Sequence, residues 1–134
     1  MADLYVADTH ALVWHLFNPT RLSAPAAEAF ARVDRGEAIL HVPLVVVAET
    51  AMVIEKGRVQ ATLDQLDALL HQMAGSRNYQ IGALDLDTVL AATRLTELTD
   101  IFDRLLVAEV RALGAALITR DEEITAARAV PVIW

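Results

Sequence analysis

The stretch from Asp100 to Ile124 changes pattern twice, and it constrains the fold more than any other part of the chain. Asp100 and Asp103 open a segment whose apolar residues recur at helical spacing, at positions 106, 107, 110 and 113. Gly114 is a typical residue at the end of a helix, and Ala115 to Ile118 is an apolar run of strand length. The pattern therefore predicts a helix, a tight turn and a buried strand in immediate succession.

The same alternation of helix and strand patterns extends over the whole chain. Further strands are expected at residues 4–7, 39–42, 79–84 and 130–133. Further helices are expected at residues 9–17, 26–33, 44–55, 60–73, 85–95 and 122–128. Strands that alternate with helices imply a parallel sheet with both faces covered. We therefore predict a single α/β domain over residues 1–134, built as a three-layer α/β/α sandwich.

Composition excludes several classes of protein. The chain is 55% hydrophobic, but its longest apolar runs, such as residues 44–48, are far too short to span a membrane. It contains no cysteine and starts without a basic leader, so a cytoplasmic location is expected. Its 18 acids outnumber its 11 bases, giving a net charge of −7. This charge argues against a general nucleic-acid binder but not against a nuclease, because bound metal ions partly neutralise clustered acids.

Four acids stand where a ligand site is expected. Asp8 follows the first strand and Asp121 follows the strand at 115–118, and ligands of open α/β sheets bind at the carboxyl ends of strands. Asp103 lies on the same side of its helix as the apolar stripe, which turns it inward. Each has a structural alternative. Asp8 and Asp121 are good helix-capping residues, and Asp100 with Asp103 forms a helix-start pattern in which Asp100 is the cap or an outer acid.

Glu49 is the fourth acid, and it is the one charge within residues 44–54. Val45, Ala48, Met52 and Val53 share its helix face, so we expect that face to be buried. A buried lone carboxylate is unfavourable unless it is paired or binds a metal. The alternatives are an arginine partner or a place at the edge of the apolar stripe.

Taken together, the four acids predict a metal site. Carboxylate oxygens favour hard cations, so the expected ion is Mg²⁺ or Mn²⁺ rather than zinc.

Other motifs are weaker. The sequence has no His-x-x-x-His pair, glycine-rich phosphate loop or Gly-x-Ser-x-Gly elbow. His41 and His71 are most simply structural or exposed. Trp14 is expected to pack, with a surface anchor for a partner as the alternative.

Several segments of the chain together resemble a known family. Five segments carry the resemblance in order and spacing, namely residues 5–14, 48–58, 100–106, 117–124 and 130–134. They include Asp8-Thr9-His10, Ala48-Glu49-Thr50, Phe102-Asp103-Arg104 and Thr119-Arg120-Asp121. The chain is similar to PIN-domain proteins, and most similar to the VapC-type ribonuclease toxins of bacterial toxin–antitoxin pairs.

The resemblance implies a metal-dependent endoribonuclease with Asp8, Glu49, Asp103 and Asp121 as the acidic site and Thr119 in support. In the hypothesis that follows from it, a bound ion would activate water to attack a phosphodiester, and Thr9 or Thr119 would orient the water or a phosphate oxygen. Arg104 and Arg120, next to the acids, are candidates for phosphate contact, with surface ion pairing as the equal alternative.

The resemblance also implies a homodimer, an RNA substrate and an antitoxin that covers the site. One difference is visible, because related chains often carry a His before the motif that here reads Leu98-Thr99-Asp100-Ile101. A PIN fold kept only to bind RNA or a partner is the main alternative. A receiver domain is disfavoured because Lys56 is the only lysine, and an Asp-x-Asp phosphatase because residue 10 is His.

Overall fold

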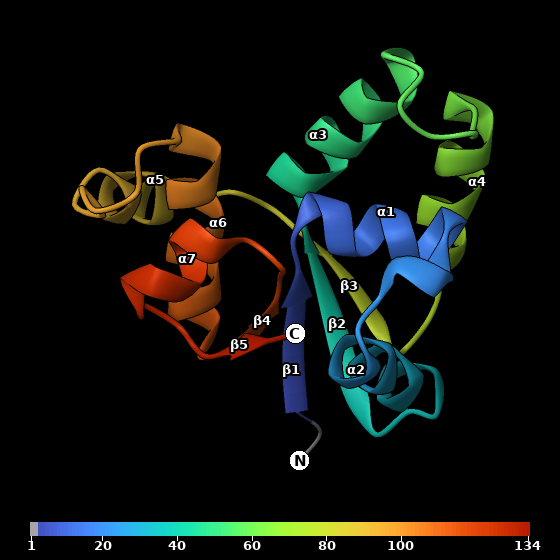
Figure 1. Ribbon diagram of the computed structural model, residues 1–134, viewed down its shortest axis with the longest axis horizontal. Coiled ribbons are helices and arrows are strands. Elements are labelled where there is room, and N and C mark those ends of the chain that lie inside the picture. The colour runs from blue at the N-terminus through green and yellow to red at the C-terminus, as the bar shows by residue number, and fades with distance from the viewer. Residues whose placement is uncertain (1–2) are drawn as a thin grey trace.

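Five parallel strands form the centre of the molecule in the computed structural model, which describes residues 3–134 (Figure 1). The strand order is β3-β2-β1-β4-β5, so the first strand lies in the middle of the sheet. The strands are β1 (Asp3–Ala7), β2 (Ala38–Pro43), β3 (Tyr79–Gly82), β4 (Ala116–Ile118) and β5 (Val132–Ile133). All four pairings are parallel, as the alternating sequence pattern predicts.

Helices cover both faces of this sheet. Figure 1 shows α1, α2 and α4 on one side of the strands and α5, α6 and α7 on the other. The helices are α1 (Thr9–Phe17), α2 (Ala24–Asp34), α3 (Leu44–Glu55), α4 (Leu63–Ala74), α5 (Leu86–Ala92), α6 (Ile101–Leu113) and α7 (Glu122–Ala127), with a short 3-10 turn at Pro19–Arg21. The predicted three-layer α/β/α sandwich is confirmed.

Several boundaries differ from those expected, and capping explains one of the two largest changes. The helix expected from Gln60 begins at Leu63, because Thr62 and Gln65 form a reciprocal capping box that fixes the first turn. The helix expected to reach Leu95 ends at Ala92. The strand expected over residues 79–84 ends at Gly82. The two helices that follow Asp8 and Pro43 have the predicted bounds.

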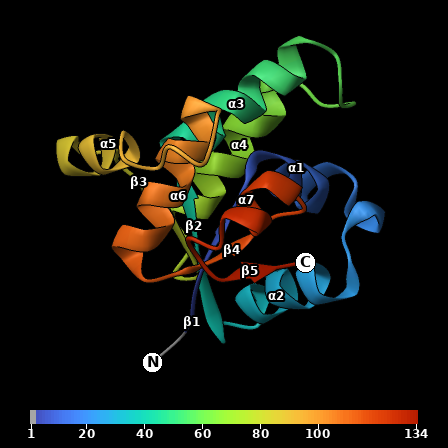
Figure 2. The ribbon, with the colours of Figure 1, turned by 60° about the vertical axis from the view of Figure 1, so that its left-hand side comes forward.

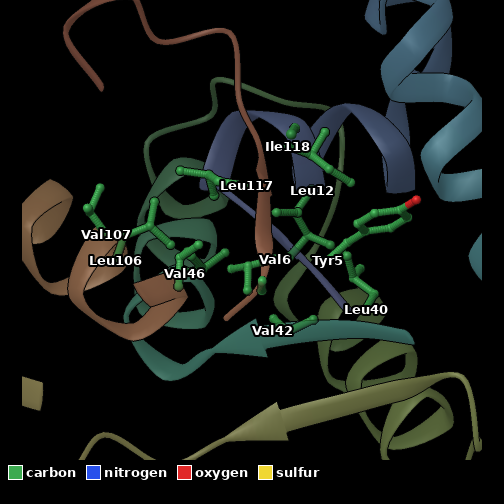
Figure 3. Packing of buried hydrophobic residues seen from close by; sticks show 14 of the residues in the cluster. Tyr5, Val6, Leu12, Leu40, Val42, Val46, Leu106, Val107, Leu117 and Ile118 are labelled. Atoms are coloured by element: carbon green, nitrogen blue, oxygen red, sulfur yellow. The ribbon is translucent and has the colours of Figure 1, made fainter. Parts of the chain in front are cut away.

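The core lies between the sheet and its helices, and Figure 3 shows its centre. Val6, Leu40 and Leu117, from three neighbouring strands, are completely buried. Leu12 of α1 and Val107 of α6 pack into the same cluster. Leu113, which was expected on the apolar stripe of α6, is instead 36% exposed, since it falls in the last turn of the helix. Burial of apolar side chains on both faces stabilises the central strands.

The topology creates a crevice at one edge of the sheet. From β1 the chain crosses to β2 on one side, while β4 pairs with β1 on the other side. Ligands in open α/β sheets bind at the carboxyl ends of strands where the order reverses in this way.

Figure 2 shows the far end of the chain, where β5 contacts α2. Among residues 3–134, the structure contains no helix of the length and apolarity that a membrane span requires.

Candidate functional site

A pocket of about 330 Å³ opens at this crevice. Its lining includes five carboxylates, and we refer to it as the acid pocket. The five are Asp8, Glu49, Asp100, Asp103 and Asp121. They come from the ends of β1 and β4 and from α3 and α6, so residues far apart in sequence become neighbours through folding. The four predicted site acids thus line one pocket, and Asp100 joins them.

Asp8 is fixed by two hydrogen bonds. Ala7 of β1 is in register with Ile118 of β4, so the next residues, Asp8 and Thr119, lie side by side. The hydroxyl of the fully buried Thr119 donates to Oδ2 of Asp8. Oδ1 accepts from the backbone N–H of Ala11 at 2.8 Å and caps α1. Asp8 therefore caps α1 and lines the acid pocket at the same time.

Asp121 is positioned by the same threonine. Its backbone N–H donates to Oγ1 of Thr119 at 3.0 Å, and its Oδ1 accepts from the N–H of Ile124 at 2.8 Å. The second bond makes Asp121 the N-cap of α7, as the structural alternative predicted. Thr119 therefore connects the acids at the ends of β1 and β4.

Glu49 reaches the pocket from α3, but not for the reason given by its sequence pattern. The buried face of α3 is formed by Val46, Thr50 and Ile54. Glu49 is half-buried, and Met52, expected on the inner face, is 47% exposed. The prediction of a buried face around Glu49 is wrong, because α3 is apolar on every side and periodicity could not select one. Glu49 lies at the edge of the stripe.

The contact that holds Glu49 comes from α1. The buried hydroxyl of Thr9 donates to Oε1 of Glu49 at 3.0 Å. Thr9 directly follows Asp8, so a single chain segment orients two of the pocket's carboxylates. The hydrogen bond thus connects α1 and α3, which pack together.

Asp100 and Asp103 occupy the first turn of α6. Oδ1 of Asp100 accepts from the N–H of Phe102 at 2.7 Å and from that of Asp103 at 3.3 Å. Asp100 is therefore the N-cap, as predicted. Asp103 is half-buried beside the buried Leu106, which keeps its side chain on the pocket side of the helix.

The acids influence one another electrostatically. Burial raises the pKa of Asp8, although the hydrogen bond from Thr119 acts against this. Burial also raises the pKa of Glu49, and the charges of Asp100 and Asp8 add to the effect. Burial together with the charges of Asp121 and Asp100 raises the pKa of Asp103 to about 7. Carboxylates that repel each other in a partly dry pocket favour a proton or a cation.

The donor set fits a hard divalent cation, since it offers carboxylate oxygens and the hydroxyls of Thr9 and Thr119. The carboxylates are not arranged as a finished cage. Within the described range, residues 3–134, no three Asp, Glu or His side chains are close enough together to hold a metal ion as placed. A cation bound by three of these side chains would have to draw them closer together.

The predicted phosphate-binding arginines lie elsewhere. Nε of Arg104 donates to the carbonyl of Leu98 at 2.6 Å and so ties down the segment before α6. The guanidinium of Arg120 lies 5.9 Å from the centre of the Trp14 ring. Neither side chain lines the acid pocket. A phosphate contact by either one stays a prediction.

The pocket instead has other polar and aromatic neighbours that sequence reasoning did not select. Lys56 and Arg58, which follow the end of α3, line it, and so do His10 and Phe102. No His-x-x-x-His pair marks His10 as a metal ligand. Proximity in sequence could have indicated His10 and Phe102 as pocket residues, because each lies within two residues of a predicted site acid. Lys56 and Arg58 follow the helix that carries Glu49.

Comparison with solved structures shows that this fold is known. VapBC2 from Rickettsia felis, in a structure bound to a promoter DNA fragment, matches with a TM-score of 0.70 at 13% identity, covering 96% of each chain. A toxin–antitoxin complex from Klebsiella pneumoniae matches with a TM-score of 0.64 at 15% identity, over 96% of this chain and 95% of the other. PAE2754 from Pyrobaculum aerophilum matches with a TM-score of 0.58 at 20% identity, over 98% and 92%. These identities establish a shared fold.

Sequence comparison gives the family. Curated proteins give no match to the chain. The family model for the PIN domain matches residues 5–130, which is nearly the full length and includes every carboxylate of the acid pocket. The family that the motifs predict is therefore confirmed, and the chain belongs to the PIN domain family.

Proposed function

We propose that the protein is an endoribonuclease that depends on Mg²⁺ or Mn²⁺ and acts as the toxin of a toxin–antitoxin pair. The observation that carries this proposal is the convergence of Asp8, Glu49, Asp103 and Asp121 on one pocket at the switch point of the sheet. A parallel sheet can place acids at this edge for other chemistry. Membership of the PIN family and the toxin–antitoxin complexes among its structural neighbours favour the nuclease.

The chain's own residues have distinct tasks in this proposal. Asp8, Glu49, Asp103 and Asp121 hold the cation, which when bound activates water and offsets charge on the phosphate. Thr119 and Thr9 keep the carboxylates of Asp8 and Glu49 in fixed orientations. Burial and the charges of Asp121 and Asp100 raise the pKa of Asp103 to about 7 when no cation is present, so Asp103 should release its proton as the cation binds.

Cleavage of a mixed RNA pool tests the proposal. The wild type should cut with Mn²⁺ and stop with EDTA, and Asp103→Asn should lower the rate by about a hundredfold or more. Asp64→Asn is the matched control, because Asp64 is an exposed acid in the first turn of α4. Since water attacks, the products should end in a simple phosphomonoester rather than a 2′,3′-cyclic phosphate.

Thermal melting separates an enzyme from a degenerate binding module. A cation that binds only the folded chain raises its melting temperature, and Asp103→Asn should reduce this response. Full metal-dependent cleavage by Asp8→Asn would remove Asp8 from the site. A wild type that neither cleaves RNA nor responds to Mn²⁺ would contradict the proposal and favour a module that only binds RNA or a partner.

We also propose a homodimer, an antitoxin partner and a cytoplasmic location. Leu86 and Leu90 of α5 are 71% and 54% exposed, which is unfavourable unless another surface covers them. Light scattering on the wild type and on the double variant Leu86→Glu/Leu90→Glu tests the dimer, because the double variant should be a monomer.

Co-expression with the product of the adjacent reading frame tests the antitoxin, since a bound antitoxin should suppress cleavage. Cell fractionation tests the location.

A further inference from the structure

A second pocket lies next to the acid pocket. It has a volume of about 530 Å³ and is lined by Trp14, Phe17 and Arg21 from the α1 side and by Arg58 and Gln60 after α3. Arg58 lines both pockets. The two hollows therefore adjoin at this side chain, and a chain-like ligand in one can continue into the other. We call the second hollow the tryptophan pocket.

Helix α1 connects the two pockets a second time. His10 lines the acid pocket and Trp14 lines the tryptophan pocket. The two residues are one turn apart and lie on the same face of the helix. Their ring centres are 5.8 Å apart, with the planes tilted by 49°. A run of aromatic surface thus leads away from Asp8 along α1.

The charge of the tryptophan pocket is opposite to that of its neighbour. Arg21 and Arg58 are both exposed and line it, and the guanidinium of Arg21 lies 5.8 Å from the centre of the Trp14 ring. In the part of the chain that the structure describes, no carboxylate lines this pocket. The whole chain carries a net charge of −7, so a corner with two arginines beside the acids is a local departure from the overall charge.

Trp14 is held in place while it lines the pocket. Its ring centre lies 5.7 Å from that of Trp134, with the planes tilted by 53°, and the residue is half-buried. An aromatic ring fixed in this way offers a stacking surface without the entropy loss of ordering a free side chain. The side-chain amides of Asn18 and Gln60, at the same pocket, can pair with polar edges.

We propose that the tryptophan pocket binds the nucleotides of single-stranded RNA that adjoin the scissile phosphate, with a base against Trp14 and phosphates at Arg21 and Arg58. This proposal rests on the nuclease function proposed above and names the form of its substrate. Proteins bind single strands by stacking bases on aromatic rings and by placing cations along the backbone. A duplex keeps its bases stacked on each other and offers none to Trp14.

The arrangement favours a nucleic acid over a segment of protein. The tryptophan pocket shares Arg58 with the acid pocket, where the proposed cleavage takes place, and its charge is complementary to phosphate. An acidic protein segment is the competing occupant, and it predicts that variants of the tryptophan pocket leave RNA binding unchanged.

Binding and cleavage can be measured apart. In an Asp103→Asn background, which keeps the RNA intact, a short fluorescein-labelled single-stranded RNA of mixed sequence is titrated in Mg²⁺ at several salt concentrations, with its duplex in parallel. The added changes are Arg58→Gln and Trp14→Leu. Arg77→Gln is the matched control, because Arg77 is exposed and precedes β3 at the amino edge of the sheet.

The expected results are quantitative. Trp14→Leu should weaken binding by about tenfold, the equivalent of one lost stacking contact. Arg58→Gln should lower the slope of log K against log salt by about 0.7, the equivalent of one phosphate contact on a single strand. Arg77→Gln should change neither value, and the duplex should bind more weakly than the single strand.

The outcomes separate this proposal from the nuclease proposal. Wild-type cleavage together with unchanged binding by Arg58→Gln and Trp14→Leu overturns the tryptophan pocket alone. Variant-sensitive binding without wild-type cleavage overturns the nuclease alone. Equal binding of single strand and duplex, or no RNA binding at all, overturns the tryptophan pocket. Trp14→Phe, which keeps an aromatic ring, should retain most of the affinity, and if Trp14→Leu does not fold, Arg58→Gln and the duplex comparison decide.

Discussion

The hydroxyl of Thr9 donates to Oε1 of Glu49 at 3.0 Å and joins the first turn of α1 to the middle of α3. Forty residues separate the two in sequence. Thr9 directly follows Asp8, so the contact fixes the relative position of two carboxylates of the acid pocket, both of which would hold the proposed cation. Hydrogen bonds to metal ligands typically matter for metal affinity as well as for the fold.

Replacement of Thr9 by Val should therefore affect both properties. The loss of one partly buried hydrogen bond should lower the free energy of unfolding by about 1 kcal/mol, and Mn²⁺ affinity should fall by about tenfold. Urea unfolding and isothermal titration with Mn²⁺ measure these changes. Thr9→Ser keeps the hydroxyl and should stay close to wild type, and an equal loss of Mn²⁺ affinity in both variants would contradict the role of the hydrogen bond.

The raised pKa of Asp103 predicts how stability depends on pH in the metal-free protein. The ordinary pKa of an aspartate side chain is 3.8, and the pKa of Asp103 in the folded chain is about 7. Between these values the folded chain holds a proton that the unfolded chain has released, so stability falls as pH rises through this window. Urea midpoints in EDTA across the window should show this decline, and Asp103→Asn should make it shallower. Asp64→Asn should keep the wild-type slope, and a rise of stability with pH in the wild type would contradict the assignment.

The buried pair of His41 and Glu109 predicts a large effect on stability away from the acid pocket. Nε2 of His41 lies 2.7 Å from Oε2 of Glu109, and both side chains are 8% exposed. Glu109→Leu leaves the imidazole buried without this partner and should cost about 1–3 kcal/mol in the free energy of unfolding. Glu109→Gln can still hydrogen-bond and should cost less. Urea unfolding measures both, and equal losses would show that the hydrogen bond has no special part.

Any side chain at Gly82 is predicted to destabilise the protein because of the same histidine. A Cβ added at Gly82 would lie 2.0 Å from Cε1 of the His41 ring. Gly82→Ala must displace the ring from Glu109 and should destabilise the protein by about 1–3 kcal/mol, as overpacked cores do. Gly75→Ala is the control, since its Cβ would meet backbone oxygens at an ordinary 3.7 Å. Similar unfolding midpoints for the two variants would contradict this account.

Much of the fold could be predicted because local signals agreed with one another. Gly114 does end α6, in the left-handed conformation expected of such a glycine. Asp8, Asp100 and Asp121 each cap the helix that follows them. Caps and periodicity are properties of a few neighbouring residues, so they can be read without knowing the rest of the chain.

The acid pocket could be predicted only in part. The carboxylates at strand ends follow from topology, because the carboxyl ends of parallel strands share one edge. Glu49 was selected for a face that is not the buried one, since α3 has apolar residues all round and burial depends on its contacts with α1 and α6. Lys56 and Arg58 were not selected, because a cation after a helix gives no sign of which pocket it will line.

The sequence by itself determined the succession of strands and helices along the chain, the residues that cap the helices, and the set of acids available for a site. These depend on backbone propensity and on the period of apolar residues, which act over a few positions. Only the tertiary structure decided that Thr119 holds Asp8, that Thr9 holds Glu49 and that His41 is buried against Glu109. These contacts join residues from different elements, and their existence depends on strand register and helix packing, which no local stretch of sequence specifies.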